Sequence, residues 1–204
     1  MFRLLTIVLL LFATMPVMTQ DRLPAIPPEK QTPEQRKAAE AFRANRKQDV
    51  FGPFVPLSRS PEVMLRAMAM GDYLRYRTVF PVKLNEFIIL ITARHFTQSY
   101  EWYVHYPIAL KEGLSREIAD AIADGRRPTG MAPDEELIHD FCTELLRNHS
   151  VSDPTYARAV QRFGEQGPIE MVGVVAYYTF QSMVLNTART PVPPGGASLK
   201  PFPK

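Results

Sequence analysis

The sequence is poor in cysteine and glycine, and both shortages limit what the protein can be. Its 204 residues include one cysteine and ten glycines. A single cysteine excludes an intramolecular disulfide framework, a four-cysteine zinc site and a CxxC redox pair. The glycine-rich nucleotide loops GxGxxG and GxxxxGK[ST] are absent, as are the HExxH zinc motif and the GxSxG nucleophile elbow. Function classes that depend on these motifs are therefore excluded.

A strong charge of one sign is also lacking. The chain has 24 Lys and Arg against 21 Asp and Glu, which gives a net charge of +3. So small an excess, without a clustered basic patch, predicts no nucleic-acid partner. The four histidines show no spacing typical of a metal site, so we expect neither a metal nor another cofactor. The protein is 46% hydrophobic and 22% charged, which is typical of a globular domain.

The N-terminus has the pattern of a secretory signal peptide. Arg3 is followed by a nearly unbroken apolar run over residues 4–13, and Pro16 then shortens the segment. We therefore predict a signal peptide over residues 1–20 and an exported protein, periplasmic or secreted, with no stable membrane contact after cleavage. The alternative is an uncleaved membrane anchor formed by residues 4–18.

Prolines are abundant, and many of the 19 lie near the two ends of the chain. Residues 21–31 form a proline-rich lead-in, and residues 188–204 form a proline-rich tail that also contains paired glycines. Neither stretch is expected to run as a regular helix or a central strand. The remaining residues, 32–187, are predicted to form one compact domain.

Within this domain, helix start signals recur and hairpin signals are missing. Thr32-Pro33 with Gln35 has the form of a capping box, and Ser60-Pro61 and Asp153-Pro154 are similar starts. The run over 82–96 is apolar on all sides, which indicates a buried central helix. As a strand it would suit a parallel sheet, but no alternation of strands and helices surrounds it. We predict an all-α fold of about eight helices, over 32–47, 60–76, 82–96, 99–111, 115–124, 133–147, 153–163 and 169–185.

One local constellation could carry chemistry. Glu101 and His105 are spaced i,i+4, on one face of a helix that is also crowded by aromatic residues. Glu86 lies in the first turn of the most apolar helix, where a carboxylate has to be paired. Two carboxylates and an imidazole suffice for proton transfer. Two simpler interpretations stay open: an ordinary surface pair for Glu101 and His105, and a complement to the helix dipole for Glu86.

The cysteine has two interpretations as well. Cys142 lies in the amphipathic helix predicted over 133–147. We expect it to be a small buried apolar residue, because nothing in the sequence indicates a low thiol pKa. The alternative is a reactive thiol.

These residues resemble a known family. The pattern Pro81-x4-Glu86-x2-Ile89-Leu90, followed by Tyr100-Glu101-Trp102-x2-His105-x-Pro107-x-Ala109-x3-Gly113-Leu114-Ser115, is similar to the carboxymuconolactone decarboxylase-like family, which includes the alkylhydroperoxidase D-like proteins. The likeness covers most of residues 55–187. It implies an all-helical fold, assembly into trimers or hexamers, and a proton relay through Glu86 and His105.

The resemblance also separates two activities. The peroxidase branch of the family carries E…CxxCxxxH, and aligned on His105 its two cysteines fall at Gln98 and Glu101. Neither residue can supply a thiolate, which argues against peroxiredoxin-type activity. The decarboxylase branch needs no cysteine, and it implies a lyase acting on a small carboxylated lactone or a related organic acid.

In this interpretation, His105 delivers the proton that quenches the carbanion left by CO2, and Glu101 or Glu86 orients it. The residues expected to bind the substrate are Trp102, Tyr103 and Gln98, with Arg94 or His95 supplying a cation for the carboxylate. Two alternatives remain: a thiol-dependent antioxidant enzyme that uses Cys142 or an external thiol, and a non-catalytic exported oligomer.

Overall fold

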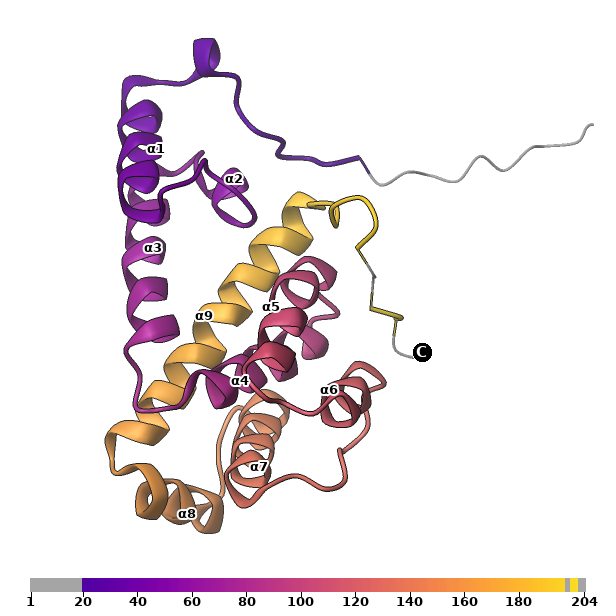
Figure 1. Cartoon of the computed structure of the whole chain (residues 1–204). Helices are drawn as coiled ribbons and strands as arrows, with labels where there is room; N and C mark the ends of the chain where they lie inside the picture. The colour runs from indigo at the N-terminus through magenta and orange to yellow at the C-terminus, as the bar shows by residue number, and fades with distance from the viewer. Residues whose placement is uncertain (1–19, 197–198, 202–204) are drawn as a thin grey trace, which may run out of the picture.

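The computed structural model describes residues 20–196 and 199–201 (Figure 1). Residues 1–19 of the predicted signal peptide lie outside this range. Every regular element among the described residues is helical. The elements are η1 (Pro28–Lys30, a 3₁₀ turn), α1 (Pro33–Arg46), α2 (Phe54–Leu57), α3 (Pro61–Tyr76), α4 (Val82–His95), α5 (Ser99–Lys111), α6 (Arg116–Ala123), α7 (Pro133–Asn148), α8 (Asp153–Phe163) and α9 (Gln166–Ala188).

The predicted all-α class is confirmed, and each of the eight expected helices is present. Two elements were not predicted: the short α2, and η1 inside the proline-rich lead-in. The largest difference in bounds is at α9, which begins at Gln166 and ends at Ala188. Pro168 lies near the beginning of this helix, where a missing backbone N–H costs little, so the helix extends further toward the N-terminus than expected.

Local capping explains why the helices begin where they do. The hydroxyl of Thr32 accepts a hydrogen bond from the backbone N–H of Gln35 at 3.2 Å, and the Gln35 side chain accepts one from the Thr32 N–H at 3.0 Å. This is the predicted capping box, with Pro33 as the first helical residue. Ser115 caps α6 through the N–H of Ile118. Such caps satisfy donors that the helix itself leaves unpaired.

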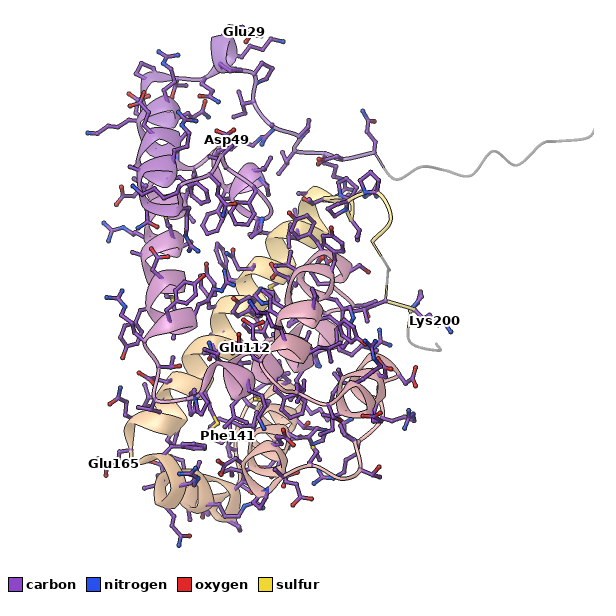
Figure 2. The ribbon with its side chains drawn as sticks, viewed as in Figure 1. Glu29, Asp49, Glu112, Phe141, Glu165 and Lys200 are labelled. Atoms are coloured by element: carbon purple, nitrogen blue, oxygen red, sulfur yellow. The ribbon has the colours of Figure 1, made fainter. Side chains whose placement is uncertain are left out.

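The core is built around α4, which contacts α5, α6, α7 and α9. Phe87, Ile88, Ile89 and Leu90 are fully buried on successive sides of this helix. Burying one such side chain stabilises the fold by roughly 1.5–3 kcal/mol. The uninterrupted apolar run therefore is the central helix that the sequence predicted. Figure 2 shows side chains filling the space between α4, α5 and α9.

Helices α1 and α3 flank this core, and α3 contacts α9 (Figure 1). Two glycines allow the close approach of α3 and α9. A Cβ atom added to Gly71 would lie 2.3 Å from the hydroxyl of Tyr177, and one added to Gly173 would lie 3.1 Å from Leu74. This contact positions the end of α3, and with it Arg75, beside α9.

Both terminal segments are held against the helical domain. The N–H of Arg22 donates to the carbonyl of Ala188 at 2.7 Å, which joins the lead-in to the end of α9. The N–H of Leu199 donates to the hydroxyl of Ser99 at 3.0 Å, so the C-terminal segment lies beside α5 (Figure 2 labels Lys200 on it). Among the described residues, no helix is both long and apolar enough to cross a membrane.

Candidate active site

The pairing of α4 with α5 brings the three predicted chemical residues together. Only residues 96–98 separate the two helices, and Thr97 adopts a left-handed backbone conformation with φ of 48°. So short a connection makes the helices antiparallel neighbours. The start of α4 therefore lies beside the second half of α5, and Glu86 meets His105 although 19 positions separate them.

His105 lies between two carboxylates. Its Nδ1 is 2.6 Å from Oε2 of Glu86, and its Nε2 is 3.4 Å from Oε2 of Glu101. All three residues are at most 4% exposed. The simpler interpretations, a surface pair and a solvated complement to the helix dipole, therefore do not describe this site. The short contact assigns a proton on Nδ1 that is donated to Glu86, and it leaves Nε2 beside Glu101.

The two carboxylates make His105 more basic. Burial by itself acts to lower the pKa of His105, but the charge of Glu86 and the hydrogen bonds to Glu101 and Glu86 outweigh it, so the pKa lies above its usual value. The imidazole is therefore protonated over a wider pH range than a free histidine. Because a proton donor has to carry its proton at working pH, this shift suits an acid catalyst.

Aromatic side chains from α9 hold the imidazole in place. Tyr178 meets the His105 ring edge to face, with 5.1 Å between the ring centroids. Tyr177 contacts Tyr178 in the same manner at 5.2 Å. Burial raises the pKa of both phenols, so they stay neutral. The ring of His105 is thus fixed by a hydrogen bond at one nitrogen and by packing on its side.

A small cavity of about 40 Å³ opens onto this group. Glu101 and His105 line it, whereas Glu86 does not. Glu86 therefore lies behind the imidazole, where it can orient and charge it, while Glu101 and Nε2 of His105 are the groups that a ligand can reach. The other lining residues come from α1, the loop before α2, α2, α3, α5 and α9: Arg46, Phe51, Pro53, Phe54, Arg75, Tyr100, Val104, Tyr177, Tyr178 and Gln181.

Sequence reasoning missed the two arginines at this cavity. Arg46 is in the last turn of α1 and Arg75 is in the last turn of α3. A basic residue at that position is commonly a complement to the helix dipole, so neither arginine carried a functional signal. Gln181 could have been found, because it is a polar residue that interrupts an apolar stretch of the last helix and is 2% exposed.

The residues expected to bind the substrate lie elsewhere. Trp102 and Tyr103 line a groove of about 460 Å³ between α5, α6 and the C-terminal segment. Gln98 caps α5 by accepting from the N–H of Tyr100 and donating to Asn186. None of these three residues lines the His105 cavity. Trp102 is buried in α5, the helix that also carries His105, and Gln98 is buried at the start of that helix.

Arg94 and His95 line a third cavity, of about 240 Å³, at the opposite end of α4. Arg94 donates a hydrogen bond to the carbonyl of Lys200 at 2.7 Å. The rise of about 1.5 Å per residue puts these residues about 12 Å along the helix from Glu86. The cations at the His105 cavity are Arg46 and Arg75 instead.

Cys142 is fully buried in α7, as expected for an apolar core residue. Burial raises the pKa of its thiol, so the reactive thiolate is disfavoured. The part of the chain that the structure describes places no three His, Cys, Asp or Glu side chains so that they could hold a metal ion. A scan of the chain against models of known protein families gives no match, and a search of curated proteins gives no significant match either.

Proposed function

We propose that the protein is a cofactor-independent acid–base enzyme of the carboxymuconolactone decarboxylase-like kind. The observation that carries the proposal is the buried His105, held between Glu86 and Glu101 and open to a cavity on the Nε2 side. Within the pattern that carries the resemblance, Glu86, Glu101 and His105 are the residues with a proposed chemical role, and the fold brings these three together.

The proposed reaction is the decarboxylation of a small carboxylated lactone or a related organic acid. The bond between the carboxylate and its α-carbon breaks, and its electron pair passes to the α-carbon as an enolate. CO2 leaves as this bond breaks, and His105 then transfers the proton on Nε2 to the α-carbon. Glu86 keeps the imidazole oriented and charged, and Glu101 returns a proton from solvent to Nε2. A group so positioned contributes about 10²–10⁴-fold to the rate.

The test is an assay of the purified protein with carboxymuconolactone and with smaller carboxylated lactones and keto acids in D2O. We expect release of CO2 and incorporation of deuterium at the α-carbon, both lost in His105→Gln. The matched control is His149→Asn, because His149 is exposed and lies in the left-handed conformation that asparagine tolerates. Turnover that persists in His105→Gln would disprove the assignment of this residue.

Peroxidase activity is the second candidate function, and the state of the cysteine speaks against it. Hydroperoxide reduction by a thiol route needs an accessible thiolate, and Cys142 is buried with a raised pKa. An assay with cumene hydroperoxide on wild type and Cys142→Ser tests it. We expect no reduction by either protein; reduction that the substitution abolishes would support the thiol route.

Self-association and export belong to the same proposal. The resemblance implies a trimer or hexamer. A row of exposed apolar residues on α9 supports burial of this face against another copy of the chain. The row is formed by Ile169, Val172, Phe180 and Met183. Export rests on the sequence of residues 1–20 alone. The native mass by light scattering tests assembly, which Ile169→Lys should weaken. Mass spectrometry of the mature N-terminus tests cleavage.

A third candidate, a non-catalytic oligomer, predicts assembly without any turnover.

A further inference from the structure

Three polar side chains at the His105 cavity contain buried atoms without a hydrogen-bond partner. They are Nε of Arg46, Nε of Arg75 and one terminal amide atom of Gln181. A buried polar group left without a partner costs roughly 1–3 kcal/mol. The described residues contain seven such atoms, and three of them belong to side chains that line this one small cavity, which makes it the place where a bound group would gain most.

The two arginines have different settings. Arg46 pairs with Asp72 through Nη2 at 2.7 Å, and its guanidinium lies over the ring of Phe54. The guanidinium of Arg75 forms no hydrogen bond or ion pair with a described residue, although the backbone carbonyl of Arg75 accepts from Asn85, and the guanidinium lies 5.1 Å from the ring centroid of Tyr76. Arg46 is therefore anchored, whereas the hydrogen-bonding capacity of Arg75 is unused. Both arginines line the cavity that a ligand would enter.

Charge balance permits an anion here despite the two glutamates. With His105 protonated, the positive charges of Arg46, Arg75 and His105 match the negative charges of Asp72, Glu86 and Glu101. A single negative charge therefore meets no net repulsion. Burial acts to lower the pKa of the Arg75 guanidinium, but the charges of the surrounding tyrosines and of Glu86 and Glu101 outweigh it, so this pKa lies above its usual value. The two carboxylates therefore act on Arg75 as well as on His105.

The cavity volume limits the ligand. A water molecule needs about 10–15 Å³ of such space, so 40 Å³ holds about three water-sized groups. That is the size of a carboxylate together with the carbon attached to it. Guanidinium groups bind carboxylates through paired N–H donors, which neutral side chains cannot match.

We propose that Arg46 and Arg75 form a carboxylate-binding subsite that holds the acid group of a short organic acid and places its α-carbon beside Nε2 of His105. This deepens the proposed function by assigning the cations that recognise the substrate. It also gives a physical role to the two unpartnered guanidinium atoms, because a carboxylate is the acceptor that such N–H donors lack.

The test is a titration of the protein with acetate, and with acetamide as the neutral compound of the same shape. The readout is the ¹H–¹⁵N signals of the arginine Nε–H groups. We expect acetate, and not acetamide, to shift the signals of Arg46 and Arg75. In Arg75→Gln the affinity for acetate should fall roughly 10- to 100-fold, the range for one charge-assisted hydrogen bond.

The matched control is Arg66→Gln, which removes one charge from an exposed position of the same helix. It should bind acetate as wild type does. If Arg75→Gln does not fold, Arg75→Lys takes its place, and binding should again weaken because the paired donors are gone. Equal affinity of wild type and the folded Arg75 variant, or equal binding of acetamide and acetate, would overturn the subsite.

The subsite and the proposed function fail separately. Acetate binding that depends on Arg75, in a protein that turns over no organic acid, supports the subsite and counts against the enzyme. Turnover that depends on His105 but is unchanged in Arg75→Gln overturns the subsite and leaves the enzyme standing.

Discussion

The two ends of α4 hold histidines in opposite electrostatic surroundings. At the start of the helix, Glu86 and Glu101 raise the pKa of His105. At its end, the cavity near His95 and His139 is lined by Arg94, Arg126, Arg127 and Arg147. There, burial lowers the pKa of His95 and of His139, and neighbouring arginines lower both further. The same side chain is thus biased toward the charged form at one end and the neutral form at the other.

The difference shows that burial alone does not decide what a histidine can do. His105 and His139 are both buried, at 3% and 7% exposure, yet their pKa values move in opposite directions. In the first, two carboxylates compensate the cost of burying the charge; in the second, Arg127 at 3.1 Å donates to Nδ1 and favours the neutral ring. Of these two buried histidines, His105 is the one biased toward the protonated form.

The largest expected effect is that of Glu86→Gln. This change removes the negative charge that holds Nδ1–H, while the shape of the side chain is kept. We expect the pKa of His105 to fall and turnover to drop about 10²–10⁴-fold. An imidazole NMR titration and a kcat measurement check both. An unchanged pKa would show that Glu101 alone produces the shift.

A smaller effect is expected on stability from His105→Gln. Because folding raises the pKa of His105, the protonated imidazole stabilises the native state fully below the unfolded pKa of about 6.5. That contribution is lost as pH rises through the folded pKa. Breaking a buried ion pair costs roughly 3–5 kcal/mol. Urea unfolding of both proteins between pH 5 and about 9 should show the largest difference at the acidic end. A difference that grows with pH would contradict the assigned shift.

At the arginine-rich end, Arg127→Gln should raise the pKa of His139 toward its ordinary value. The substitution removes both a nearby positive charge and the donor to Nδ1. Burial, which is the main cause of the lowered value, remains, so we expect a shift of about one unit or less. The titration of His105 in the same spectrum is the internal control and should not move.

Salt should produce the smallest effect. Raising ionic strength from 0.1 to 1 M shortens the screening length from about 10 to about 3 Å. The ring of His95 is partly desolvated, but the residue reaches solvent and feels the charge of Arg147, so its pKa should rise by a few tenths of a unit when this charge is screened. His105 is buried against its carboxylates and should titrate unchanged. An equal change in the pKa of both histidines would show that the contacts of His105 with Glu86 and Glu101 are open to solvent.

Much of the fold could be predicted from the sequence because its signals are local. Thr32 with Gln35, and Ser115 with Ile118, bond within a few residues, so their patterns define helix starts directly. The short α2 was missed because four residues are too few for a periodic pattern. At the candidate site, Glu101 and His105 could be paired from spacing alone, since they share one helical face.

The sequence by itself determined the helices, the buried central segment, and the absence of the cysteine pair that a peroxidase of the resembled family needs. Tertiary structure decided which charges meet. Glu86 reaches His105 only because α4 and α5 are antiparallel, and Arg46 and Arg75 reach the cavity only because α1 and α3 end beside α9. Contacts between distant helices depend on packing and leave no periodic trace in the chain. Arg94 and His95 were therefore expected at a cavity that Arg46 and Arg75 in fact line.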